Sequence, residues 1–290
     1  MIIAPRRALA AMPDWIADRV AGTAAAALRA ELETWPKPGL VSHVDSGSHI
    51  DMDASTFRAS AAAITPFFGR LTLAGAVGSG MDKLREIGLE AERAMLKETS
   101  GANTHRGAIF ALGLLSAAAG ATWSGALETS LHWNARELSV TVRRRWGAAI
   151  MCGPIPLRSH GTDALRRYGA GGARAQAAAG FPHAIEVGLP ALRLGRTLAP
   201  GDPEAARVQS FFALLESLED TNLLHRGGSD GLRFAQQQAT HFLRRGGIAQ
   251  ERWREEAAAV HRAFVARGLS PGGCADLLAI TLFLDALGAR

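Results

Sequence analysis

Apolar residues along this chain recur mainly at the spacing of α-helices, and no alternating pattern typical of β-strands persists. Alanine, leucine, arginine and glutamate dominate the long segments, whereas β-branched residues are sparse. We therefore predict an all-α fold, a single large multi-helix domain over residues 1–290, with residues 1–12 flexible. The predicted helices are 14–34, a segment from 55 kinked at Pro66, 81–97, a segment from 104, 126–146, 203–224, 230–245, 251–267 and 274–287. Glycine and proline break residues 151–203 into short pieces.

The predicted helix from residue 104 differs from the others because its residues 107–115 are apolar on every side. Such a helix is expected to be buried. Four polar residues come at its start, namely Asn103, Thr104, His105 and Arg106. Free backbone N–H groups and the positive end of the helix dipole would lie beside them, which is typical of an anion-binding site. The alternative is that Asn103 or Thr104 only caps the helix.

Three further segments place polar side chains at predicted helix ends. These candidates are Glu31, Lys37, His49 and Asp51 within 31–52, Asp220, Asn222, His225 and Arg226 within 211–228, and Asp276 within 270–284. In the second segment an apolar helical stripe turns polar, and buried polar groups require partners or a ligand. Each segment also has a structural explanation, because acids cap helix starts and cations suit helix ends. Arg174, in the glycine-rich GAGGAR, completes the set of phosphate-type donors.

Composition narrows the classes of function. The net charge of +5 and a pI near 10.0 suit a polyanionic partner, either nucleic acid or a phosphorylated small molecule. Aromatic residues make up only 6% of the chain and are not interleaved with basic ones, so we expect no nucleic-acid partner. No segment is long and apolar enough to span a membrane, no signal peptide is apparent, and two cysteines suggest the cytoplasm. The HExxH, GxSxG, Walker A and GxGxxG motifs are absent.

Six motifs, in this order, resemble the triphosphoribosyl-dephospho-CoA synthase family, the CitG/MdcB group. They are PKPGLV at 36–41, GSHIDM at 47–52, GANTHRGAIF at 101–110, GAR and GFP within 172–182, DTNLLHRGG at 220–228 and SPGGCADLLA at 270–279. The resemblance covers nearly the whole chain from Glu31 onward. Arg106 stands where many members carry lysine, Gln176 where many carry an acid, and Cys274 where serine is common. The position of Arg106 favours the malonate decarboxylase (MdcB) branch.

The resemblance implies an all-helical enzyme that joins ATP and 3′-dephospho-CoA and releases adenine, with Mg²⁺ accompanying ATP. Its product would be the prosthetic-group precursor for the acyl-carrier subunit of malonate decarboxylase or citrate lyase. Cleavage of the adenine–ribose bond builds positive charge on the sugar, which carboxylates stabilise. We nominate Glu31 and Asp51 for catalysis, Asp220 and Asp276 for Mg²⁺ or a ribose, and the remaining polar candidates for substrate binding. Those substrate-binding residues are Lys37, His49, Asn103, Thr104, His105, Arg106, Arg174, Asn222, His225 and Arg226.

Two other classes remain open on the sequence alone. One is a non-catalytic helical protein that binds phosphorylated ligands or nucleic acid through its basic helices. The other is a hydrolase of ADP-ribose-like bonds, which would not need dephospho-CoA. A homodimer is a further open alternative, and we expect no membrane partner.

Overall fold

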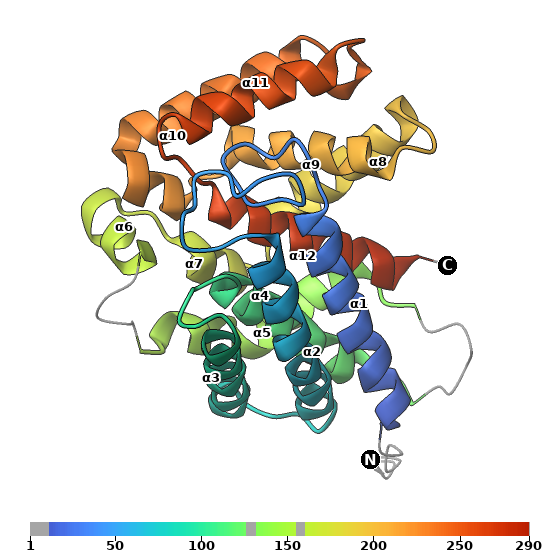
Figure 1. Cartoon of the computed structure of the whole chain (residues 1–290). Helices are drawn as coiled ribbons and strands as arrows, with labels where there is room; N and C mark the ends of the chain where they lie inside the picture. Colours follow the sequence, from blue (N-terminus) through green and yellow to red (C-terminus); the bar gives the residue numbers. More distant parts are fainter. Residues whose placement is uncertain (1–11, 126–131, 155–159, 290) are drawn as a thin grey trace, which may run out of the picture.

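The computed structural model describes residues 12–125, 132–154 and 160–289, and these are helical nearly throughout (Figure 1). The segment 1–11, for which flexibility was predicted, lies outside the described residues. The described α-helices are α1 Asp14–Leu32, α2 Ala54–Ala76, α3 Met81–Glu98, α4 Arg106–Thr122, α5 Ala135–Cys152, α6 His160–Tyr168, α7 Gly172–Ala178, α8 Leu189–Leu198, α9 Pro203–Ser217, α10 Thr221–Arg244, α11 Trp253–Val265 and α12 Gly272–Gly288. A π-helical turn, Ala184–Gly188, and a 3₁₀ turn, Gly247–Ala249, complete the helical elements. No strand occurs within these ranges, so the prediction of an all-α, multi-helix domain is confirmed.

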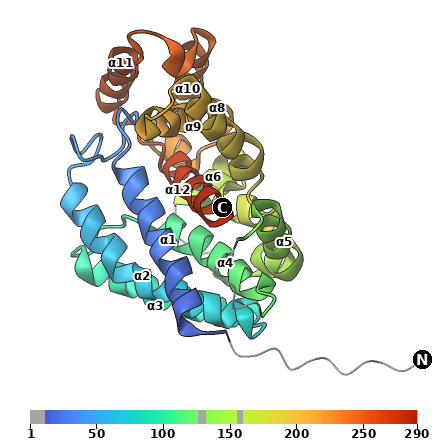
Figure 2. The same ribbon diagram turned by 90° about the vertical axis from the view of Figure 1, so that its right-hand side faces the viewer.

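Helix α12 lies between two groups of helices, α1–α5 on one side and α8–α11 on the other (Figures 1 and 2). It packs against α1, α4 and α9. Within the first group, α2 packs against α1, α3 and α4. One contiguous cluster of buried apolar residues draws on helices from α1 to α12, so the two groups share a core.

Helices α4 and α12 are buried along most of their length, as their all-round apolar sequences predict. Close approach of backbones helps to bury α4. A Cβ at Gly75 would lie 1.8 Å from the Ala117 carbonyl oxygen, and one at Gly120 would lie 1.9 Å from the Thr72 carbonyl oxygen. Only glycine permits α2 and α4 to pack this tightly.

Several predicted helix boundaries are wrong. The helix predicted over 203–224 ends at Ser217, because Leu218 is extended (φ −77°, ψ 134°) and Asp220 then caps a new helix. A helix that was not predicted begins at Thr221. A kink at the non-helical Gly228 (φ 60°, ψ −162°) divides α10, and the helix predicted from residue 230 corresponds to the part after that kink. Helix α4 begins two residues later than predicted, at Arg106.

The helix predicted over 126–146 begins at Ala135, since the Asn134 side chain caps it by accepting from the N–H groups of Arg136 (2.9 Å) and Glu137 (3.2 Å). Residues 126–131 of that prediction lie outside the described residues.

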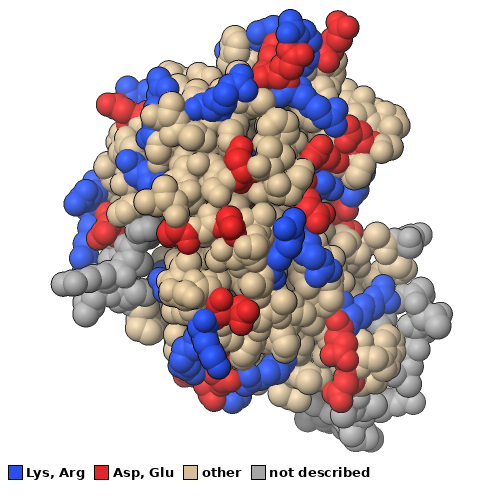
Figure 3. All heavy atoms as spheres, in the orientation of Figure 1, with Lys and Arg blue, Asp and Glu red and all other residues tan. Residues whose placement is uncertain are grey.

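Among the described helices, none combines the length and apolar character needed to cross a membrane. On the face shown in Figure 3, basic and acidic side chains are interspersed. The tightest basic run, Arg143, Arg144 and Arg145, is exposed on α5. A charge run of this kind is typical of a solvated helix face.

Candidate functional site

The centre of the candidate site is a buried ion pair at the end of α1. The Lys37 side chain is 1% exposed, and its ammonium group donates to the Glu31 carboxylate and, at 2.9 Å, to the Glu31 carbonyl oxygen. Burial lowers the pKa of Lys37 and raises the pKa of Glu31, and the attraction between the two opposes both shifts. Shifts of the pKa with these causes are frequent at functional sites, and they also occur in structural ion pairs.

Asp276, on the first turn of α12, lies directly against the start of the buried helix α4. A Cβ at Gly107 would stand 1.9 Å from Asp276 Oδ2, so a larger residue at this position would force the carboxylate to move. Burial raises the pKa of Asp276 well above its ordinary value, and the charges of Glu31 and Asp220 raise it further. A backbone hydrogen bond from Ala108 offsets part of that rise. The positive end of α4, which the sequence suggested for a substrate anion, is therefore occupied by a carboxylate of the chain itself.

Asp220 joins the starts of two helices. Its Oδ1 accepts from the backbone N–H groups of Asn222 (2.8 Å) and Leu223 (3.2 Å) in α10, and its Oδ2 accepts from Cys274 N–H (2.9 Å) in α12. Burial raises the pKa of this carboxyl, and the three backbone hydrogen bonds lower it in part. Glu31, Asp220 and Asp276 are thus brought into one electrostatically coupled group.

The polar residues before α4 have separate partners. His105 is 4% exposed and caps α4 through its backbone, while Asn103 Oδ1 accepts from Arg106 N–H at 3.3 Å. Burial, and secondarily the charge of Lys37, lower the pKa of His105 to about 3, so its imidazole is neutral near pH 7. Arg106 is exposed and pairs with Glu92 of α3 at 3.1 Å. His105 therefore faces the buried centre, whereas Arg106 lies on the surface.

The predicted residues of loop 33–53 and α10 form a second, more exposed group. His49 Nε2 lies 2.8 Å from Ser270 Oγ, and its Nδ1 lies 3.4 Å from the Arg226 guanidinium. Asp51, 60% exposed, lies 3.7 Å from His49 Nδ1. His225 is exposed on α10, and Asn222 lies next to Gly272 at the start of α12. No contact among the described residues joins Asp51 to Glu31, so the pairing of these two acids in catalysis stays a prediction.

Arg174 caps the C-terminal end of α5. Its guanidinium donates to the carbonyl oxygens of Ile150 (2.5 Å), Met151 (2.9 Å), Gly153 (3.0 Å) and Pro154 (3.0 Å). These contacts satisfy carbonyl groups that have no partner within the helix and place a cation at its negative end. The contacts explain the residue without a ligand, and its assignment to substrate binding stays a prediction.

The sequence analysis missed three residues around this centre. His261 Nδ1 accepts a hydrogen bond from Gly39 N–H (3.3 Å), and His261 Nε2 lies 3.2 Å from Asp45 Oδ1. Arg207 donates to Thr34 Oγ1 (2.9 Å) and helps to lower the pKa of Lys37. Ser60 is fully buried between Thr104 and His105. Only Ser60 had a visible signal, because it is a polar residue at helical spacing from Phe57 and Ile64.

The acids of this centre fit the way in which proteins hold magnesium with a nucleotide. Mg²⁺ typically takes one or two carboxylates and completes its octahedron with phosphate oxygens and water. Asp276 keeps partial exposure, and Asp220 has lone pairs left although both its oxygens accept backbone N–H groups. Within the described residues, no group of three or more His, Cys, Asp or Glu side chains is arranged to hold a metal by itself. An Mg²⁺ ion held here would take its remaining ligands from phosphate oxygens and water.

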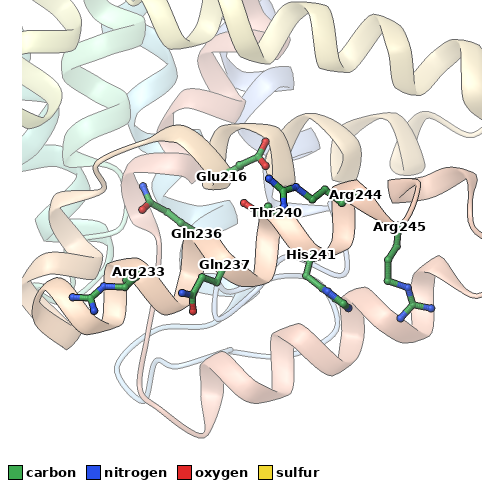
Figure 4. A pocket seen from close by; sticks show the side chains of 8 residues that line it. All are labelled: Glu216, Arg233, Gln236, Gln237, Thr240, His241, Arg244 and Arg245. Carbon is green, nitrogen blue, oxygen red and sulfur yellow. The ribbon is translucent and has the colours of Figure 1, made fainter.

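A surface hollow of about 520 Å³ lies away from this centre. Glu216 of α9 and residues of α10 and its end line it (Figure 4). The α10 group is Arg233, Gln236, Gln237, Thr240, His241, Arg244 and Arg245. None of the nominated residues lines the hollow, and two of its arginines are paired, Arg233 with Asp230 and Arg245 with Glu256. The nominated residues lie at helix ends and in loop 33–53 instead.

Taken together, the fold and the site define an all-helical protein with coupled acids, a buried lysine and a neutral histidine at converging helix ends. The sequence model of the family described as CitG: ATP:dephospho-CoA triphosphoribosyl transferase matches residues 17–290. The chain belongs to this family, and it is a transferase.

Curated relatives resemble the chain over nearly its full length, and each is named "Probable 2-(5''-triphosphoribosyl)-3'-dephosphocoenzyme-A synthase". The relative from Stutzerimonas stutzeri is 42% identical over 93% of this chain and 92% of its own length. The one from Pseudomonas putida is 40% identical over 94% and 96%, and the one from Acinetobacter calcoaceticus is 37% identical over 89% and 87%. No solved structure matches the chain.

Proposed function

We propose that this protein transfers the triphosphoribosyl group of ATP to a ribose hydroxyl of 3′-dephospho-CoA and releases adenine. The observation that carries the proposal is the convergence of Glu31, Lys37, His105, Asp220 and Asp276 at the ends of four helices. These residues come from four separate segments of the chain, and they supply both acids and proton donors. The names of the family and of the relatives describe the same reaction.

The bond between C1 of the ribose and N9 of adenine breaks, and a new bond forms between that carbon and the acceptor oxygen. The acceptor hydroxyl loses its proton, and adenine takes one up, so charge and protons balance. Positive charge develops on the sugar, and the carboxylate of Glu31 is our first candidate to stabilise it. A carboxylate of the same centre is also suited to accept the hydroxyl proton.

Mg²⁺ bound with ATP supplies charge neutralisation for the triphosphate, and Asp276 and Asp220 are the residues that would hold it. Lys37 and Arg207 place positive charge beside the same centre. His49 and Arg226 lie at the more exposed rim, where Arg226 can bind a phosphate group of either substrate in bidentate fashion. Asp51 stays our second candidate for a catalytic acid.

The direct test is to incubate the protein with ATP, Mg²⁺ and 3′-dephospho-CoA and to quantify free adenine. We expect one adenine per acceptor consumed, and no adenine when dephospho-CoA is omitted. Formation of ADP, AMP or free ribose products in place of adenine would refute the transfer reaction. Tight, salt-sensitive DNA binding without turnover would favour the non-catalytic alternative.

Glu31→Gln keeps the shape of the side chain and removes its charge. We expect it to slow adenine release at least about 100-fold, the usual scale for a lost acid or base. Glu90→Gln is the control, because Glu90 of α3 also pairs with a cation, Arg70 of α2, but does so outside the candidate site. Asp51→Asn, measured in the same assay, decides whether Asp51 belongs to the catalytic group.

We further propose that the product serves the acyl-carrier subunit of malonate decarboxylase, with citrate lyase as the alternative. The support is the resemblance around Arg106 noted above. Deleting the gene should abolish growth on malonate and leave citrate fermentation unchanged, whereas the opposite result would assign the protein to citrate lyase.

A further inference from the structure

Arg207 of α9 is held against the C-terminal end of α1 by one edge of its guanidinium. Its Nε donates to Thr34 Oγ1 at 2.9 Å, and its Nη2 donates to the Glu33 carbonyl oxygen at 3.5 Å. Thr34 is fully buried, so this edge is anchored at a defined point of the protein. Glu31 and Lys37, the buried ion pair of the candidate site, stand three residues before and three residues after Thr34 in the chain.

The other edge of this guanidinium has no partner among the described residues. A guanidinium carries five N–H donors, and Arg207 turns one donor of Nε and one of Nη2 toward α1. Both donors of Nη1 and the second donor of Nη2 are left over. Arg174 differs, because it donates to four carbonyl oxygens with both of its Nη groups. The contact with the end of α1 therefore uses only part of Arg207.

Arg207 also lacks a carboxylate partner within the part of the chain that the structure describes. Asp202 and Glu204, two acids at the start of the same helix, are instead paired with Arg254 at 2.6 Å and 3.6 Å. Burial lowers the pKa of the Arg207 guanidinium, and the attraction of nearby acids offsets part of that decrease. Arg207 is thus a partly buried cation with free donors, and buried charge in proteins is usually paired or bound to a ligand.

The neighbouring cation of the centre cannot take the same role. The ammonium group of Lys37 is bonded to Glu31, and the side chain is 1% exposed. Arg207 lies close enough to Lys37 to lower its pKa, yet it is itself partly exposed. The candidate site therefore offers Arg207, and not Lys37, to an anionic group that arrives from solvent.

We propose that Arg207 binds a phosphate group of a substrate through the free edge of its guanidinium, while Thr34 and the end of α1 hold the other edge. Two parallel N–H donors on the free edge match two oxygens of a phosphate. The assignment to a substrate rests on the proposed function, in which ATP and dephospho-CoA both carry phosphates. The anion site itself is a property of the protein and does not depend on turnover.

Calorimetry with inorganic triphosphate, ATP, dephospho-CoA and adenosine tests the site without turnover. We expect Arg207→Gln to weaken triphosphate binding at least about tenfold, the scale of a hydrogen bond to a charged group, and to leave adenosine binding unchanged. A matching loss for ATP assigns the phosphate to the donor substrate, whereas a loss for dephospho-CoA assigns it to the acceptor. Unchanged affinity for triphosphate, ATP and dephospho-CoA would overturn the proposal.

Arg196→Gln is the matched control. Arg196 already donates to both carboxylate oxygens of Asp285, so we expect this variant to bind triphosphate as the wild type does. Arg207→Lys keeps the positive charge but cannot present two parallel donors, and it should lose less affinity than Arg207→Gln. This milder variant decides the question if the glutamine variant fails to fold, because wild-type affinity in Arg207→Lys would then contradict the two-donor contact.

The alternative is that Arg207 only caps α1, and steady-state kinetics of adenine release separate the two roles. For a binding role we expect Arg207→Gln to raise the KM of the substrate whose phosphate it holds at least about tenfold, with kcat changed less than about twofold. A lower kcat at unchanged KM and unchanged triphosphate affinity would show a structural role.

The phosphate site and the proposed function fail in different ways. If the wild type releases no adenine while Arg207→Gln still loses triphosphate binding, the proposed function fails and the phosphate site stands. If the wild type and Arg207→Gln release adenine with the same KM and bind triphosphate equally, the phosphate site fails and the function stands.

Discussion

The carboxylate of Asp276 lies so close to Gly107 that a Cβ at the glycine would be 1.9 Å from Oδ2. The contact joins the starts of α4 and α12 and determines where the third acid of the centre stands. Gly107→Ala should displace Asp276, destabilise the protein by about 1–3 kcal/mol through overpacking, and reduce adenine release at least about tenfold.

Gly88→Ala is the matched control for that substitution. Gly88 lies within α3 with no heavy atom near the position of a Cβ, so alanine should raise the free energy of unfolding by about 0.4–1 kcal/mol. Urea denaturation and the adenine assay on both variants check the pair. Normal activity in Gly107→Ala would show that the position of Asp276 does not matter for turnover.

The stability of the protein should depend on the charge balance of the buried pair formed by Glu31 and Lys37. Lys37→Met leaves the Glu31 carboxylate buried without its partner, so we expect a loss of about 3–5 kcal/mol in the free energy of unfolding. Replacing Glu31 by leucine as well removes the unpaired charge and should recover most of that loss, while neither variant regains activity. Equal stability of the single and double variants in chemical denaturation would contradict this account.

His105 makes the stability depend on pH. Its pKa is about 3 in the folded protein and 6.5 in the unfolded chain, so between these values the unfolded chain binds a proton that the native imidazole does not. The free energy of unfolding should therefore fall as the pH drops below 6.5, by at most about 1.4 kcal/mol per pH unit, and this contribution should be constant above 6.5.

The raised pKa values of Glu31 and Asp220 act in the opposite direction, because native carboxylates then bind protons more readily than unfolded ones. Comparison with His105→Gln isolates the histidine. Thermal denaturation from pH 4 to 8 should show the two proteins diverging below pH 6.5 only.

Asp220→Asn tests whether the Asp220 side chain stabilises the starts of both α10 and α12. Three backbone N–H groups bond to the two carboxylate oxygens, and asparagine offers only one oxygen. One buried N–H should lose its acceptor, at a cost of about 1–3 kcal/mol. Asp53→Asn is the control, because all hydrogen bonds to the Asp53 side chain go to Oδ1, and it should lower the melting temperature less.

The candidate site was predictable in part. The residues around α4, α10 and α12 were recognisable as polar positions next to apolar helices, and Glu31, Lys37, His105, Asp220 and Asp276 do meet. Their partners were not predictable, since those contacts join residues far apart in the chain, such as Asp220 with Cys274. From the sequence pattern alone, Arg106 and Arg174 both look like phosphate-binding residues. In the structure Arg106 pairs with Glu92 on the surface, whereas Arg174 caps the end of α5.

The sequence by itself determined that the protein is helical and that α4 and α12 are buried, because helix periodicity and all-round apolarity are local properties. Only the tertiary structure decided which helix ends meet. It showed that the start of α4 receives Asp276, and that Lys37, a residue type usually exposed, is enclosed with Glu31. The physical reason is that a helix satisfies its own backbone except at its ends, and the partners of those ends depend on how distant helices pack.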